Sequence, residues 1–152
     1  MENFFEKPKL IKGGIAVDER GQVTFANDFD FKGVKRFYLA ENFSCATIRG
    51  FHGHLKEAKY GLAVSGTALV VVARMDHLEK PSQKSEVQRF ILSARKPEIL
   101  YIPAGYANGI RALEENTKVI FFSTTSMEEA KEDDFRFPYD YWGKDVWEIK
   151  NF

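Results

Sequence analysis

The feature that most limits what this chain can fold into is a series of short segments rich in branched and aromatic residues, each bounded by turn residues. About nine such segments follow one another at roughly even spacing. They cover residues 14–17, 22–25, 34–40, 45–49, 59–64, 67–73, 87–92, 98–102 and 117–125. Branched and aromatic residues favour strands, and Gly, Pro, Asn and Asp favour the turns between them. The pattern predicts an all-β sandwich or jelly-roll barrel, whose mouth or interior would hold a ligand.

Turn-forming residues separate these segments at three places. The polar cluster 18–21 ends in Gly21 and predicts a hairpin, and Ser65-Gly66 between two apolar runs predicts a tight one. Residues 103–109, with one Pro and two Gly, predict a turn that either holds a side chain towards a cavity or simply connects two strands.

One short helix is expected near the C-terminus, at residues 127–133. Ser126 can cap its first turn, and Glu129 stands three residues later, as in a capping box. The tail beyond it is aromatic, with rings at 135, 137, 139, 141, 142 and 147. A packed tail or a dimer seam would explain those rings without any ligand.

The length of 152 residues predicts a single domain, 1–152, and a chain of this size buries ~68–70% of its unfolded surface. Fourteen Phe, six Tyr and two Trp, with a formal net charge of zero, exclude the composition of a disordered chain. The same zero charge argues against a nucleic-acid binder that depends on phosphate contacts. A local basic pocket remains compatible with it.

The ends and the cysteine count predict a soluble cytoplasmic protein. Cys45 is the only cysteine, so no intramolecular disulfide can form, and its thiol is expected to be small and buried. Residues 1–8 lack the basic start and apolar run of a signal peptide, and no window approaches the ~18 apolar residues of a membrane span.

The chemistry is expected in residues 49–60, which gather two His, two Lys, an Arg and a Glu. His52 and His54 are spaced i, i+2, and residues at that spacing on a strand point to the same face, so both imidazoles can enter one concavity. Paired imidazoles can bind a metal, or one can act as a general base near neutral pH. Alternatively, both are ordinary polar residues at the end of a strand.

Two motifs carry a resemblance to a known family. The chain reads Arg-Gly-Phe-His at 49–52, with a second His at 54, and Ile-Pro-Ala-Gly-Tyr-Ala-Asn-Gly at 102–109. In this it resembles the RmlC-like cupins, which include the dTDP-4-dehydrorhamnose 3,5-epimerases and the nucleotide-sugar 3,4-ketoisomerases, from about residue 14 to residue 147. The resemblance implies a cupin jelly-roll barrel, a nucleotide-diphosphate sugar as substrate, most simply a dTDP-sugar, and a homodimer without nucleic-acid or membrane partners.

The second motif also bears on metal binding. Metal-binding cupins place a further His where this chain has Asn108. An amide is a poor transition-metal ligand beside imidazole, and catalytic sites for such metals typically use about three protein ligands. We therefore expect a site without metal or cofactor, with a metal-dependent cupin enzyme as a rival that predicts bound metal after purification.

The resemblance implies roles for four residues. His52 matches the His that removes a proton next to the C4 ketone, Lys59 matches the Lys that stabilises the enolate oxygen, and Arg49 matches the Arg that contacts the diphosphate. Asp145 is the best match for the acid that orients the base, although Asp134 and Asp140 compete with it. The chemistry requires such a set, because a proton next to a ketone becomes acidic only when charge on the oxygen meets a fixed cation.

The chain departs from the 3,5-epimerases at one position. Their acidic Tyr on the last long strand corresponds to Phe121, which has no proton to give, so double epimerisation is disfavoured. The pair of histidines is instead similar to that of the 3,4-ketoisomerases. The residues expected to bind substrate or supply the missing acid are Arg49, His54, Tyr38, Tyr60, Tyr106 and Asn108.

These observations favour a metal-independent isomerase that epimerises a nucleotide-linked 4-keto-6-deoxy sugar in deoxysugar and surface-polysaccharide biosynthesis. A nucleotide-sugar 3,4-ketoisomerase is the first alternative. The second, from another class, is a sugar-nucleotide-binding cupin that has lost catalysis, as Phe121 and Asn108 would allow.

Overall fold

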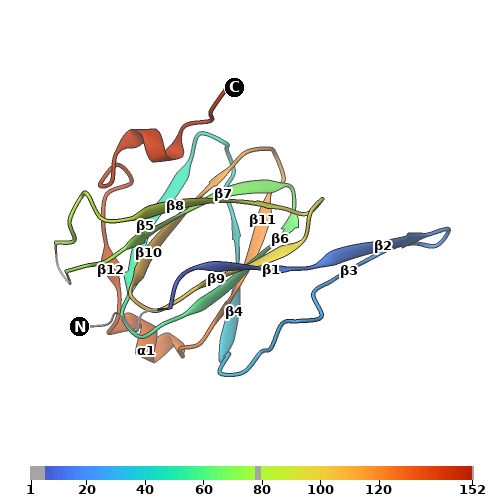
Figure 1. The fold of residues 1–152 in the computed structure, drawn as a ribbon, viewed down its shortest axis with the longest axis horizontal. Coiled ribbons are helices and arrows are strands. Elements are labelled where there is room, and N and C mark those ends of the chain that lie inside the picture. Colours follow the sequence, from blue (N-terminus) through green and yellow to red (C-terminus); the bar gives the residue numbers. More distant parts are fainter. Residues whose placement is uncertain (1–5, 78–79, 152) are drawn as a thin grey trace.

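Two five-stranded antiparallel sheets face each other in the computed structural model, which describes residues 6–77 and 80–151 (Figure 1). The first sheet contains, in spatial order, β1 (Lys9–Lys12), β9 (Glu98–Ile102), β6 (Lys59–Ser65), β11 (Lys118–Ser123) and β4 (Arg36–Glu41). The second contains β12 (Phe135–Arg136), β5 (Ile48–His54), β10 (Tyr106–Ala112), β7 (Thr67–Arg74) and β8 (Val87–Ser93). Strands distant in sequence are neighbours in both sheets, as in a jelly roll. The predicted all-β cupin architecture is confirmed.

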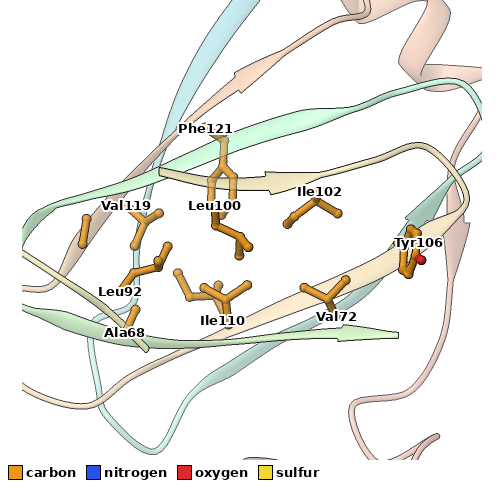
Figure 2. Close-up of a cluster of buried hydrophobic side chains, with 11 residues drawn as sticks. Ala68, Val72, Leu92, Leu100, Ile102, Tyr106, Ile110, Val119 and Phe121 are labelled. Atoms are coloured by element: carbon orange, nitrogen blue, oxygen red, sulfur yellow. The ribbon is translucent and has the colours of Figure 1, made fainter. Parts of the chain in front are cut away.

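The main core lies between the two sheets, and Figure 2 shows its side chains pointing towards one another. Strand β7 shows how the alternation of a strand builds this core. Val70 and Val72 point into the space between the sheets, where they pack with Leu100 and Phe121. The intervening side chains point to the other face of the sheet. Because β7 is buried on both faces, its sequence is apolar throughout rather than alternating.

The aromatic tail covers that other face. Phe51 of β5 packs against Trp142 and Trp147, with ring centroids 4.8 and 5.3 Å apart. Each indole N–H donates a hydrogen bond to the main chain, Trp142 to Ser82 and Trp147 to Tyr139. Trp147 belongs to a short 3-10 helix, η1 (Lys144–Trp147). The two tryptophans therefore form a packed tail within the chain.

The predicted hairpins are both present. Strands β2 (Gly14–Asp18) and β3 (Gly21–Phe25) pair only with each other and project from the barrel (Figure 1). The turn between β6 and β7 contains Gly66 at φ +70°, where a Cβ would lie 2.3 Å from the Thr117 hydroxyl oxygen. Glycine is therefore required there by both conformation and space.

The predicted helix exists but is shorter than expected. Helix α1 spans Met127–Lys131 and starts at Ser126, whose side chain and that of Glu129 form the expected capping box. It ends two residues before the predicted limit, because Asp133 turns its carboxylate to the loop between β5 and β6. No helix in the described part of the chain is long and apolar enough to cross a membrane.

Three strands were not predicted: β1, β10 and β12. The turn expected at 103–109 ends at Gly105, and β10 begins at Tyr106. Ala107, Asn108 and Gly109 are weak strand formers, but β10 lies between β5 and β7 and pairs with both. A Cβ on Gly109 would lie 2.7 Å from the Arg49 carbonyl oxygen, so the close approach of β5 excludes a larger residue.

Candidate active site

A pocket of about 900 Å³ opens between the two sheets beside helix α1. Strands β4, β5, β6, β10 and β11 and helix α1 all contribute to its wall. Its polar and charged lining residues are Arg36, Tyr38, Glu41, Arg49, His52, His54, Glu57, Lys59, Asn108, Lys131, Asp134 and Arg136. His52 and His54 both line it, which confirms that the i, i+2 spacing on a strand directs the two imidazoles into one cavity.

His52 is the more accessible imidazole, with 45% of its side chain exposed. Its Nδ1 lies 3.5 Å from Asp134 Oδ1. Since the carboxylate favours a proton on Nδ1, the lone pair of the neutral ring is on Nε2. Partial burial lowers the pKa of His52, and this outweighs the opposing effect of Asp134. At neutral pH the ring is therefore a free base.

Asp134 is itself kept ionised. Burial alone would raise its pKa, but the hydrogen bond and charge of Arg136, whose Nε lies 3.0 Å from Oδ2, lower it overall. The three residues form a chain in which Arg136 fixes Asp134 and Asp134 faces the ring of His52. Such an arrangement holds a basic imidazole in one orientation.

Lys59 supplies a buried positive charge on the neighbouring sheet. Only 7% of its side chain is exposed. Its Nζ donates a hydrogen bond to Asn108 Oδ1 at 3.2 Å and lies 3.9 Å from Glu57 Oε2. Asn108, which the sequence comparison with metal cupins singled out, therefore orients a lysine in this pocket.

Glu57 lies in the stretch 49–60 where the chemistry was expected, but nothing in the sequence assigned it a role. Its side chain is 1% exposed, and its Oε1 accepts hydrogen bonds from Arg36 at 2.9 Å and from the Ser123 hydroxyl. Burial would raise the pKa of this carboxyl, but His54, Lys59 and Ser123 together lower it to about 2. Glu57 is therefore an ionised carboxylate in the inner wall of the pocket.

His54 lies between two oxygen acceptors. Its Nδ1 lies 2.5 Å from the main-chain carbonyl oxygen of Asp133, and its Nε2 lies 2.9 Å from Glu57 Oε2. The second pair is at ion-pair distance without the alignment of a hydrogen bond. His54 is 8% exposed, so it touches the pocket but directs both nitrogens towards the protein.

Asp133 organises the turn that joins the two halves of the site. Its carboxylate accepts hydrogen bonds from the backbone N–H groups of Leu55, Lys56 and Glu57, at 2.7, 2.8 and 3.1 Å. This buried residue thereby fixes the loop between β5, which carries the histidines, and β6, which carries Lys59. Its only signal in the sequence was its place as the last residue of the predicted helix, 127–133.

Asp145 is not beside His52. It lies exposed in η1, outside the pocket, with its side chain over Gly143. The acid facing His52 is Asp134, one of its two competitors, because β12 pairs with β5 and brings the residues after α1 to the histidine strand. The assignment of Asp145 is corrected accordingly.

The three candidate tyrosines are placed differently. Tyr38 lines the pocket and stacks on Phe121, with ring centroids 5.3 Å apart. Tyr60 packs instead against Tyr101 in an aromatic cluster outside the pocket, and Tyr106 is buried in the core. Among the described tyrosines that were candidates for the acid, Tyr38 alone borders the cavity.

Positive charge gathers around this pocket although the whole chain is neutral. Its lining includes five Lys or Arg residues and three carboxylates: Arg36, Arg49, Lys59, Lys131 and Arg136 against Glu41, Glu57 and Asp134. Arg49 lies on β5 and donates through Nε to Asn42 Oδ1 at 2.8 Å. An anionic ligand would therefore meet a locally positive surface.

Within residues 6–77 and 80–151, no group of three or more His, Cys, Asp or Glu side chains is arranged to hold a metal ion. The cavity residues fit acid–base chemistry instead. A neutral imidazole and a buried ammonium face one space, which is the combination needed to remove a proton next to a carbonyl group.

The chain is similar to known proteins over most of its length. Residues 6–140 match the family model described as dTDP-4-dehydrorhamnose 3,5-epimerase. The spore coat polysaccharide biosynthesis protein SpsL of Bacillus subtilis (strain 168) is 33% identical over 94 residues. The match covers 61% of this chain and spans 61% of the length of that relative.

Solved structures share the fold. The rmlC epimerase of Mycobacterium tuberculosis superposes with a TM-score of 0.74 at 20% identity, over 98% of this chain and 76% of the epimerase. The QdtA 3,4-ketoisomerase of Thermoanaerobacterium thermosaccharolyticum, in complex with TDP, gives a TM-score of 0.66 at 20% identity, over 91% and 93% of the two chains. At such identities the likeness establishes the architecture.

Proposed function

We propose that this chain, which belongs to the dTDP-4-dehydrorhamnose 3,5-epimerase family, epimerises a nucleotide-linked 4-keto-6-deoxy sugar at one carbon. The observation that carries the proposal is the placement of one accessible neutral imidazole, His52, in the same pocket as the buried ammonium of Lys59. The match to a protein of spore coat polysaccharide biosynthesis supports a role in making a surface polysaccharide.

In the first step, His52 Nε2 takes the proton from the carbon next to the C4 ketone. The C–H electron pair then becomes the carbon–carbon double bond of the enolate, and the former carbonyl oxygen gains the negative charge. Asp134 stabilises the imidazolium that forms. Positioned acid–base groups of this kind contribute ~10²–10⁴-fold to a rate.

Lys59 would stabilise the oxygen that gains charge. Its ammonium is already fixed by Asn108 and withdrawn from water, so no reorganisation is needed when the enolate forms. A charge in such a place acts more strongly than it would in water.

Inversion requires a proton on the opposite face of the enolate. Phe121 cannot give one, and its neighbour Tyr38, directly opposite it in the register of β4 and β11, is the hydroxyl we assign to this step. Tyr38 protonates the carbon and regains a proton from solvent, and the His52 imidazolium releases to solvent the proton that it took. A single acid–base pair of this kind favours epimerisation at one carbon rather than two.

The nucleotide end of the substrate would lie along the positive wall of the pocket. Arg49 suits a diphosphate because its guanidinium can make two parallel hydrogen bonds to phosphate oxygens. The TDP complex of the similarly folded QdtA ketoisomerase supports a dTDP-sugar.

A 3,4-ketoisomerase is the second candidate, because two histidines line the pocket. That reaction moves the keto group between neighbouring carbons and requires proton transfers at both. His54 directs both nitrogens to protein oxygens, which leaves His52 as the mobile base and favours the epimerase.

The test is NMR of a panel of dTDP-linked 4-keto-6-deoxy sugars in D2O, with and without the protein. Deuterium at C3 with inversion there is the result expected of a 3-epimerase, whereas movement of the keto group to C3 identifies a ketoisomerase. Binding of the nucleotide sugar without any exchange would favour the non-catalytic cupin. Elemental analysis after purification without chelator tests the rival metal enzyme.

We also propose a cytoplasmic location and a homodimer. Exposed apolar side chains on the projecting hairpin and on β4, including Val17, Val23 and Phe37, support contact with a second copy. Sedimentation equilibrium would determine the oligomeric state, and cell fractionation would determine the location.

A further inference from the structure

Glu57 is a buried carboxylate to which the proposed reaction gives no role. Taking such a charge out of water is costly unless it is paired and hydrogen-bonded. Arg36 and Ser123 satisfy Oε1 from strands β4 and β11. Arg36 is itself held by the carbonyl oxygen of Thr125, at 3.1 Å from its Nε, so this side of the carboxylate is fixed by the scaffold.

The other oxygen, Oε2, faces the site. His54 Nε2 lies 2.9 Å from it and Lys59 Nζ lies 3.9 Å from it. Both of these residues line the pocket, on strands β5 and β6. One carboxylate oxygen is thus the shared neighbour of two site side chains from different sheets.

This arrangement determines the protonation of His54. Its Nδ1 must carry a proton to donate to the carbonyl oxygen of Asp133. A neutral ring would then place the unprotonated Nε2 2.9 Å from an ionised carboxylate oxygen, which is repulsive. The doubly protonated ring makes both contacts favourable.

Two adjacent cations disfavour each other's charge unless an anion lies between them. The groups around the pair are Arg36 from β4, Ser123 from β11, Asn108 from β10 and the Asp133 carbonyl after α1, and none of these supplies a second negative charge at Oε2. Glu57 is therefore the group that compensates both His54 and Lys59.

We infer that Glu57 is a positioning and specificity-determining residue, whose carboxylate holds His54 and Lys59 side by side as cations in the pocket. The inference rests on the proposed function and deepens it. The enolate oxygen then meets the fixed charge of Lys59, whose position is held by the same carboxylate that pairs with His54. His54, already protonated, does not act as a second base, which leaves proton abstraction to His52.

The direct experiment is an NMR titration of the protein labelled with ¹⁵N-histidine. At pH 7 the wild-type His54 ring should show two protonated nitrogens, and in Glu57→Gln it should lose one of them. Glu114→Gln, which removes an exposed carboxylate paired with Arg95, is the matched control and should leave the His54 signal unchanged.

Kinetics supply a second measurement. In Glu57→Gln, kcat for deuterium exchange should fall about tenfold or more with KM within about threefold, and the loss should deepen as pH rises. Glu57→Asp should restore part of the activity and of the His54 signal. A purely structural role would lower the active fraction without changing the pH profile.

The outcomes separate the two claims. A neutral His54 in the wild type at pH 7 overturns the inference even if Glu57→Gln fails to fold, and so does an identical His54 titration in the two proteins. Absence of exchange in the wild type, with His54 charged as expected, counts instead against the proposed epimerase.

Discussion

His52 Nδ1 and Asp134 Oδ1 lie 3.5 Å apart in the wall of the pocket, and the residue next to Asp134 holds the second histidine. Asp133 accepts from His54 through its main-chain oxygen and fixes the β5–β6 loop through its carboxylate. Asp133 and Asp134, which follow α1, therefore orient both imidazoles. It gives them different partners, a carboxylate for His52 and a carbonyl group for His54.

The first prediction concerns the base. His52→Asn should abolish deuterium exchange into the sugar, with a loss of ~10²–10⁴-fold, because the proton acceptor is gone. NMR in D2O measures the rate of deuterium exchange into the sugar. His77→Asn, at an exposed position outside the pocket, is the matched control and should exchange at the wild-type rate. Exchange that survives unchanged in His52→Asn would remove His52 from its role.

The second prediction is a pH dependence. His52 works as a free base, and burial lowers its pKa, so kcat/KM should fall only when the pH drops below the usual range of a histidine. Asp134 opposes that lowering. Asp134→Asn should therefore move the acid limb of the profile to still lower pH and reduce kcat about tenfold or more.

Assays between pH 5 and 8 would measure the acid limb in the wild type and in Asp134→Asn. Asp145→Asn is the control, since that residue lies exposed in η1, and its profile should match the wild type. An acid limb that moves with Asp145→Asn but not with Asp134→Asn would contradict the geometry.

Much of this site could be predicted because it depends on short spacings. His52 and His54 share a face since side chains on a strand alternate, and Lys59 lies at the start of the following strand. The capping box of α1 was likewise readable from Ser126 and Glu129. In each case, local chain geometry alone determines the relationship.

The partners of these residues could not be predicted in the same way. Asp134 reaches His52 only because β12 pairs with β5, a two-residue strand with no pattern of its own. Glu57 resembled any charged loop residue, and its burial follows from the approach of Arg36 and Ser123 from the other sheet. Asp145 was chosen on resemblance, which carries no information on how the tail packs.

The third prediction concerns the cation. Lys59→Gln should lower kcat by ~10²–10³-fold with a smaller effect on KM, because the charge acts on the oxygen that becomes negative only as the proton leaves. Steady-state kinetics on the preferred sugar measure the two constants separately. Lys56→Gln, in the loop just before it, is the control. A change confined to KM would mean that Lys59 binds the ground state instead.

The fourth prediction separates exchange from inversion. Tyr38→Phe should still exchange deuterium, because His52 can return a solvent deuteron to the same face, but the ratio of inversion to exchange should drop about tenfold. Tyr60→Phe is the matched control, since Tyr60 packs outside the pocket. NMR of the product gives both quantities, and an unchanged ratio in Tyr38→Phe would assign the acid elsewhere.

The last prediction is a stability effect of Glu57 in acid. Its pKa in the folded protein is about 2, against 4.5 for the free side chain, so the folded state binds this proton less readily than the unfolded state. The stabilisation is complete above the unfolded value and disappears as the pH falls from about 5 towards 2, and its size is ~3 kcal/mol.

Urea unfolding at pH 7, 4 and 3 measures this dependence. Between pH 7 and pH 3 the wild type should lose ~2 kcal/mol more free energy of unfolding than Glu57→Gln, whose amide does not titrate, because pH 3 is still above the folded pKa. The variant should be the less stable of the two at pH 7, since it leaves Arg36, His54 and Lys59 without their anion. Parallel pH dependences would mean that the carboxylate is not ionised in the folded protein, and the charge balance assigned to the pocket would then be wrong.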